Sequence, residues 1–105
     1  MGGCEMHLRP IGSLESCILD MPENTSVVAA SKRALGRNKS SRKLIEIYNS
    51  SNGTIYLGGK DVGKSNGYPI KKGQVKAIPV NSNSLEGVFL FSETATSIVL
   101  LEYYE

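Results

Sequence analysis

The residues with the clearest chemical potential are Gly58, Gly63, Lys64 and Ser65, which satisfy the G-x-x-x-x-G-K-S pattern of phosphate-binding loops. In such loops, backbone N–H groups at the start of a helix surround the phosphates, the lysine reaches the outer phosphates, and the serine holds Mg²⁺. Here the loop is followed by Asn-Gly-Tyr-Pro, a sequence that favours turns and leaves no room for the helix. We therefore interpret this stretch as a glycine-rich connection between strands and expect no nucleotide cofactor.

Few other residues could do chemistry. The chain has one histidine, His7, and two cysteines, Cys4 and Cys17, whose spacing lacks a fourth ligand and is not that of a zinc site. A Ser/His/Asp set would have to use His7, and no pair of carboxylates stands out. We therefore expect a protein that is not an enzyme, with no catalytic residue, no metal and no cofactor.

Length and charge narrow the class of protein. A chain of 105 residues fits one domain with a substantial core. It has no run of 18 apolar residues and no basic-then-apolar start, so we expect neither a membrane span nor a secretory signal. The net charge of +2 hides a basic centre, because residues 32–80 hold eleven of the twelve Lys and Arg residues between two acidic ends.

From Arg42 onward, short runs rich in β-branched and aromatic residues recur, separated by turn-forming residues. The runs span residues 43–49, 54–58, 74–80, 87–91 and 97–104. Asn52-Gly53 lies between the first two and predicts a tight hairpin, for which a type I′ turn is one possible form. The spacing favours an antiparallel β-sandwich or small barrel of about six to eight strands. Residues 26–31 add a further expected strand, although residues 24–36 could instead form a capped helix.

Residues 1–24 show no sustained period and contain Pro10 and Pro22. We expect them to form an extended N-terminal arm, attached to a β-sandwich domain of residues 25–105. The arm has apolar side chains that need burial, so they are candidate partner-binding residues. They are Leu8, Ile11, Leu14, Ile18 and Leu19.

The last two runs are apolar on both faces. In residues 87–91, Val88 and Leu90 point one way while Phe89 and Phe91 point the other, and residues 97–104 alternate in the same manner. A half-solvated sheet would show one polar face. Either the chain itself covers the second face or another subunit does. Phe89 and Phe91 are therefore candidate partner contacts.

The central stretch SSRKLIEIYNSSNGTIYLGGKDVGKSNGYPIKKGQ, residues 40–74, resembles a pattern of small virion proteins of tailed bacteriophages. The matching positions are Arg42, Asn49, Tyr56, Gly58, Gly59, Val62, Asn66, Gly67, Pro69 and Gly73. In this interpretation Gly58 and Gly59 leave the strand with positive φ, and Asn66-Gly67 makes the next turn.

The resemblance covers residues 25–105 and implies a multi-copy structural protein of the virion, assembled in the host cytoplasm. It implies most directly a capsid decoration or cement protein bound to the major capsid protein. A neck, head–tail connector or tail component is the alternative.

A basic segment offers a further alternative, nucleic-acid binding. Residues 31–43 hold six of the twelve basic residues and no acidic one, including Arg33, Arg37 and Arg42, so the segment could neutralise several phosphates. It contains no aromatic residue for base stacking, so a solvated loop, or a loop that meets an acidic capsid surface, is favoured. Glycan binding through the five tyrosines is a weaker third hypothesis.

Overall fold

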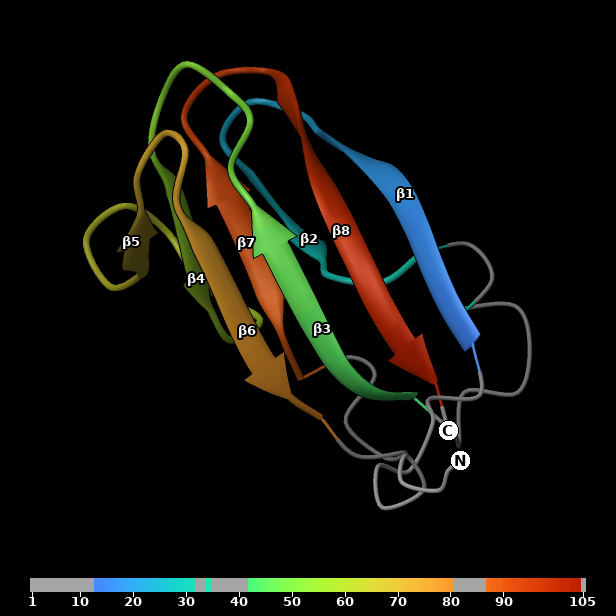
Figure 1. The fold of residues 1–105 in the computed structure, drawn as a ribbon. Helices are drawn as coiled ribbons and strands as arrows, with labels where there is room; N and C mark the ends of the chain where they lie inside the picture. The colour runs from blue at the N-terminus through green and yellow to red at the C-terminus, as the bar shows by residue number, and fades with distance from the viewer. Residues whose placement is uncertain (1–12, 32–33, 35–41, 81–86, 105) are drawn as a thin grey trace, which may run out of the picture.

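The computed structural model describes residues 13–31, 34, 42–80 and 87–104. Within them, eight strands form two four-stranded antiparallel sheets that pack face to face (Figure 1). Sheet A has the strand order β1-β8-β3-β6 and sheet B the order β2-β7-β4-β5. The sheets are not closed into a barrel, so the predicted all-β sandwich is confirmed. The strands are β1 (Ser13–Met21), β2 (Thr25–Val28), β3 (Arg42–Tyr48), β4 (Ile55–Gly58), β5 (Tyr68–Ile70), β6 (Val75–Pro79), β7 (Phe89–Ser92) and β8 (Thr96–Tyr104).

The core lies between the inner faces of the two sheets. Every second residue of β3 and β8 points inward, and these side chains meet the inward row of sheet B. The most buried apolar members are Met21, Ala29, Ile45, Ile47, Ile55, Ile70, Leu90, Ile98 and Leu100, each at most 2% exposed. The strands supply this core because their period of two separates an inward from an outward row.

The expectation that residues 1–24 form an arm without strand alternation is wrong, because residues 13–21 form strand β1. Ser13–Met21 pairs with β8 through all nine residues, and exposed and less exposed side chains alternate along it. The period was hidden because both rows mix polar and apolar types: the inward row begins with Ser13 and Glu15, and the outward row contains Leu14 and Ile18. Residues 1–12 lie outside the described part of the chain.

The predicted Asn52-Gly53 hairpin is also wrong. β3 and β4 belong to different sheets, and β3 is already paired on both sides, by β8 and β6. Asn49, which is fully buried, organises the connection instead: its Nδ2 donates to the carbonyl oxygens of Gly53 at 2.8 Å and Ile70 at 2.7 Å. Its Oδ1 accepts from the N–H of Ser51 at 3.0 Å. Gly53 has no positive φ, so no type I′ turn forms.

Two short strands, β2 and β5, form the edges of sheet B. Thr25–Val28 forms β2, which confirms the strand expected within residues 26–31 over its first part. β5 was not predicted, because it has only three residues and one of them is Pro69.

Candidate functional site

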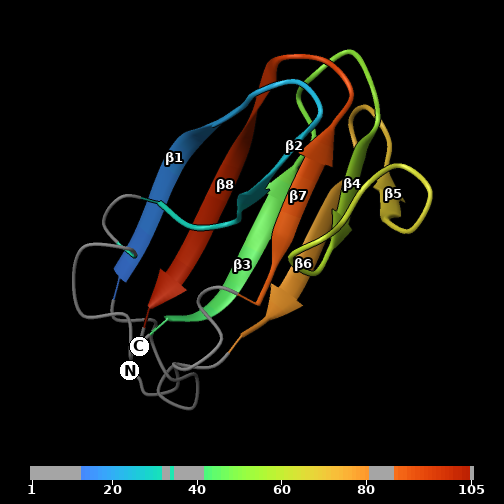
Figure 2. The same cartoon turned by 180° about the vertical axis from the view of Figure 1, so that it is seen from behind.

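The glycine-rich loop of residues 59–67 joins β4 to β5 and folds over the outer face of sheet B, which is nearest the viewer in Figure 2. Val62 is only 6% exposed, and Ser26 Oγ of β2 donates to the carbonyl oxygen of Lys60 at 3.0 Å. A Cβ at Gly58 would lie 2.8 Å from Val62 Cγ2, and one at Gly67 would lie 2.6 Å from Tyr56 Cβ. The glycines therefore permit close packing of the loop on its own sheet.

The same loop lacks the geometry of a phosphate site. After Ser65 the chain makes a turn and enters β5, so the helix that the motif requires is replaced by a strand. The N–H of Gly63 already donates to Asn66 Oδ1 at 2.6 Å. Lys64 Nζ lies 3.5 Å from Glu93 Oε2, and both side chains are more than half exposed. Gly63 and Lys64 of the motif thus contact other residues of the same chain.

Positive φ does not explain these glycines, contrary to expectation. Gly58 and Gly59 adopt no positive φ. In the described part of the chain, positive φ occurs at Gly73, with φ 82°, and at Asn24, with φ 53°. Both stand in connections between the two sheets, Gly73 before β6 and Asn24 before β2. Gly58 and Gly67 are required by a neighbour's proximity rather than by backbone conformation.

Substitution of Gly67 tests this packing. Gly67→Ala is expected to destabilise the protein by about 1–3 kcal/mol, because the added methyl group would overlap Tyr56 and the carbonyl oxygen of Gly63. The matched control is Gly53→Ala, since a Cβ at Gly53 meets no atom within 4 Å and the residue has no positive φ. Urea denaturation measures both changes. Equal losses of stability in the two variants would contradict the packing role of Gly67.

Phe89 and Phe91, the candidate contacts on β7, lie on the outer face of sheet B, the face that this loop partly covers. The ring of Phe91 packs beside that of Tyr56, with centroids 6.4 Å apart. Gly67 of the loop packs closely on the Cβ of Tyr56. Both phenylalanines are partly buried. The chain itself therefore covers part of this second apolar face.

The outer face of sheet A has no such cover among the described residues. Figure 1 views the molecule from this side. The alternation and register of the four strands place a continuous apolar surface there: Leu14 and Ile18 of β1, Val99, Leu101 and Tyr103 of β8, Leu44 and Tyr48 of β3, and Val75, Ala77 and Pro79 of β6. Leu14 is 55%, Ile18 63%, Tyr48 43% and Val75 57% exposed. Exposed apolar patches of this extent usually mark interaction surfaces.

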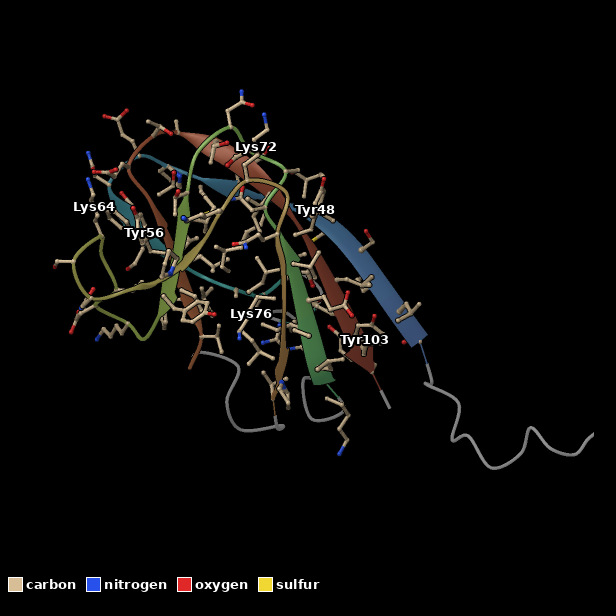
Figure 3. All side chains as sticks on the ribbon, turned by 60° about the vertical axis from the view of Figure 1, so that its left-hand side comes forward. Tyr48, Tyr56, Lys64, Lys72, Lys76 and Tyr103 are labelled. Carbon is tan, nitrogen blue, oxygen red and sulfur yellow. The ribbon has the colours of Figure 1, made fainter. Side chains whose placement is uncertain are left out.

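Two carboxylates lie on this outer face of sheet A, Asp20 on the edge strand β1 and Glu46 on the middle strand β3. The hydroxyl of Tyr103 on β8 donates to Glu46 Oε2 on β3 at 2.9 Å. This hydrogen bond raises the pKa of Tyr103, with smaller contributions from burial and from the charge of Glu46. In Figure 3, Tyr103 and Tyr48 lie on the sheet A side of the molecule, away from Tyr56 and Lys64 on the sheet B side. The bond pairs the polar group of Glu46 within the mainly apolar middle of this face.

Arg42 is not part of a surface, contrary to its prediction as a partner-binding residue. Its side chain is 1% exposed, and its Nη1 lies 2.6 Å from Glu102 Oε2 and 3.0 Å from the carbonyl oxygen of Ala29. The cause is a shift of register between Arg42 and Leu44, a β-bulge opposite Tyr104 and Tyr103 of β8. The bulge turns Arg42 into the core, while Lys43 is exposed.

Further hydrogen bonds satisfy the Glu102 carboxylate, which is fully buried. The backbone N–H of Ser31 donates to Oε2 at 3.1 Å and the Ser31 hydroxyl donates to Oε1 at 2.5 Å. The Tyr104 hydroxyl also donates to Oε1, at 3.1 Å. Burial, followed by the Glu102 charge, raises the pKa of Tyr104. These hydrogen bonds join the segment after β2 to sheet A, so the polar groups stabilise the fold.

The remaining candidate residues divide into three groups. Leu14 and Ile18 are exposed on the outer face of sheet A. Leu19 lies on the inward row of β1, where it is partly buried and packs against the core. Leu8, Ile11, Arg33 and Arg37 lie outside the described residues.

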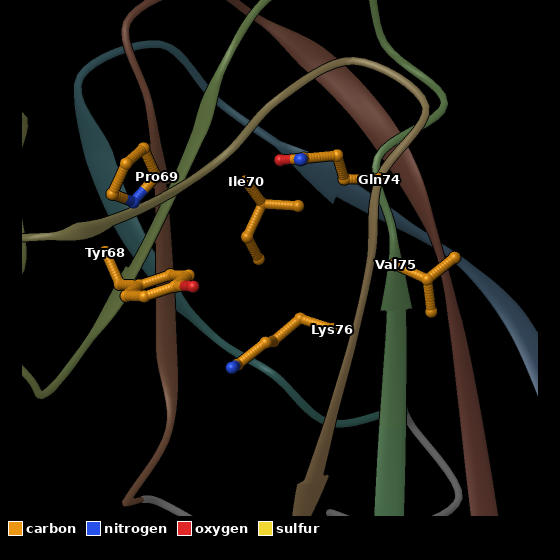
Figure 4. Close-up of a pocket in the computed structure, with 6 residues that line it drawn as sticks. All are labelled: Tyr68, Pro69, Ile70, Gln74, Val75 and Lys76. Carbon is orange, nitrogen blue, oxygen red and sulfur yellow. The ribbon is translucent and has the colours of Figure 1, made fainter.

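A shallow cavity of about 290 Å³ opens between the edge strands β5 and β6 (Figure 4). Tyr68 and Ile70 line it from β5, and Val75 and Lys76 from β6. Lys76 Nζ lies 4.7 Å from the centre of the Tyr68 ring, a cation–π contact between the two edge strands. No sequence signal indicated this cavity, because it depends on which strands become the sheet edges.

The described residues contain no cluster of three His, Cys, Asp or Glu side chains that could hold a metal ion. Within the same part of the chain, no helix has the length and apolar character needed to span a membrane. Cys17 is a free thiol whose pKa is raised by burial and, to a smaller extent, by the charges of Glu102 and Glu15. No protein-family model, curated protein or solved structure matches the chain.

Proposed function

We propose that this chain is a non-enzymatic structural protein of a virus particle, which binds another protein of the particle through the outer face of sheet A. One observation carries the proposal. Leu14, Ile18, Tyr48 and Val75 expose large apolar side chains on one sheet face, while the loop of residues 59–67 covers part of the opposite face. The asymmetry between the faces makes sheet A the surface that gains from a partner.

The composition of this face suits a protein partner. The cores of protein interfaces are enriched in aromatic and apolar residues and depleted of charges. The outer face of sheet A has two tyrosines, Tyr48 and Tyr103, and its one carboxylate in the middle strands, Glu46, is already bonded to Tyr103. A partner with an apolar surface and one hydrogen-bond donor facing Glu46 would satisfy both kinds of group.

The kind of particle is proposed from the resemblance of residues 25–105 to small virion proteins of tailed bacteriophages. A decoration or cement protein bound to the major capsid protein fits best, because such a protein needs a rigid domain with one docking face. A neck, connector or tail component would use the same face. Nucleic-acid binding through residues 31–43 is less well supported, because Arg42, one of the six basic residues, is buried in an ion pair with Glu102.

Two tyrosines allow a matched test. Tyr48→Ser is expected to weaken binding to particles that lack the protein by about tenfold or more, because tyrosines at the centre of an interface are frequent hot spots. The control is Tyr68→Ser, which removes a similarly exposed ring, 57% against 43%, from the opposite sheet. Co-sedimentation with the particles measures both affinities. Equal binding by the two variants would contradict docking through the outer face of sheet A.

A further inference from the structure

The sandwich has four edge strands, and three of them carry features that oppose pairing with another strand. β6 places Lys76 on its inward row and ends in Pro79, and β5 has three residues including Pro69. β2 has four residues, and its Ser26 is bonded to the loop of residues 59–67. Inward charges, prolines and short lengths are the usual protections of exposed sheet edges.

The fourth edge strand, β1, has fewer of these protections, because its one inward charge, Glu15, stands near its start and not at its centre. It has nine residues and contains no proline, lysine or arginine. Its register with β8 is regular from end to end, without a bulge. Its two acidic residues, Glu15 and Asp20, stand near its ends, and the four residues between them are uncharged. Within the described residues, no strand pairs with its other side.

We propose that β1 pairs antiparallel with β1 of a second copy of this chain, so that the two four-stranded A sheets become one continuous sheet of a two-fold dimer. A two-fold axis perpendicular to the sheet keeps the inward rows of both copies on the same side. Residues directly opposite each other must therefore come from the same row. This restricts the dimer to a small set of registers, each centred on a residue of β1.

Charge selects among these registers. An axis at Glu15 or at Asp20 would place two carboxylates directly opposite each other, which is destabilising. An axis at Cys17 brings all nine residues of β1 into the ladder and avoids both contacts, since Glu15 then faces Leu19 and Asp20 faces Leu14. In this register the two Cys17 residues face each other across the axis.

The pairing also extends the apolar surface. Leu14 and Ile18 lie on the outward row of β1, so the outer faces of the two A sheets would meet at the axis without an intervening charged strand. The dimer would thus present two copies of the face to one partner surface, which raises avidity. The pairing itself needs no partner, so it can be tested on the isolated protein and fails independently of the proposed docking.

The first test is the mass of the full chain by sedimentation equilibrium over a range of concentrations. The wild-type chain is expected to reach the mass of two chains, and Ser16→Lys that of one, because it places a lysine at the exposed centre of the edge. The control is Ala77→Lys, which adds the same charge at an exposed site on the opposite edge of sheet A and should leave the dimer intact. A monomeric wild-type chain, or a dimer that survives Ser16→Lys, overturns the proposal.

The second test fixes the register. In either kind of antiparallel pair, facing Cα atoms are about 4.5–5.5 Å apart, which a disulfide can span. Mild oxidation of a Cys4→Ser chain, leaving Cys17 as the one thiol, is expected to link the dimer covalently. The reaction should be run at alkaline pH, because burial raises the pKa of Cys17. The link should not form when Ser16→Lys is added. A dimer that forms but cannot be linked overturns the register centred on Cys17.

Discussion

Replacement of Glu102 by alanine is expected to destabilise the protein by about 3–5 kcal/mol, because it leaves a buried arginine without its counter-charge. Arg42 is 1% exposed, and its Nη1 lies 2.6 Å from the Glu102 carboxylate. Ser31 and Tyr104 would lose their acceptor at the same time. Single domains are stable by about 5–15 kcal/mol, so this one change would remove a large share of the total. Guanidinium denaturation followed by circular dichroism measures the loss.

A double variant provides the control for this prediction. Arg42→Met combined with Glu102→Met removes both charges and is expected to be more stable than Glu102→Ala alone, since apolar residues can replace a buried ion pair. Arg42 Nη2 supports this expectation, because it is buried and has no hydrogen-bond partner among the described residues. If the double variant loses as much stability as the two single variants added together, this expectation is contradicted, because removing both charges then gives no compensation.

Deletion of residues 1–24 is expected to abolish folding, because it removes β1. The strand pairs with β8 through nine residues, and Met21, 1% exposed, belongs to the core. Its loss would expose the edge of β8 and open the core at Ile98 and Leu100, which lie opposite Leu19 and Cys17. The circular dichroism of a chain that begins at Thr25 should be that of an unfolded protein.

Two point variants within β1 separate loss of the core from loss of surface. Met21→Ser should cost about 2–5 kcal/mol, as for other truncations of buried methionines. Ile18→Ser, at a side chain that is 63% exposed, should change the stability of the isolated protein little. If the chain that begins at Thr25 folds with the stability of the full chain, β1 is an accessory to the sandwich rather than one of its strands.

The strands that could be predicted from the sequence are of two kinds. In some, the inward and outward rows of side chains differ in polarity, and the others are strongly apolar throughout. β3 and β8 could be predicted because Ile45, Ile47, Ile98 and Leu100 recur at a period of two. β1 could not, because Glu15 points inward near the buried Glu102 while Ile18 points outward. Its alternation appears only when the polar cluster in the core is known.

Connections between strands were harder to predict than the strands. Asn52-Gly53 is a strong local signal for a hairpin, but local preference cannot show that β8 and β6 occupy both sides of β3. Tertiary pairing decided the outcome, and the buried Asn49 side chain supplies the hydrogen bonds that a hairpin turn would have made.

The candidate site was only partly within reach of the sequence. The apolar outward row of β8 indicated a second apolar face, and Leu14 and Ile18, which were expected to bind a partner, are exposed on that face. Their contact with a partner stays a prediction. Which sheet face stays open depends on where the loop of residues 59–67 folds, a long-range property. Arg42 was assigned to a surface because no residue pattern indicated the β-bulge that turns its side chain inward.

The central claim is that the outer face of sheet A is a docking surface. For the virion protein proposed above, it is tested most directly by a reconstruction of the particle that assembles from the same genome. The account predicts density for this sandwich on the capsid, with Tyr48, Val75 and Leu101 buried against the major capsid protein. The loop of residues 59–67 should face solvent. A domain bound through that loop, with the outer face of sheet A open to solvent, would contradict the claim, as would a particle that does not contain the protein.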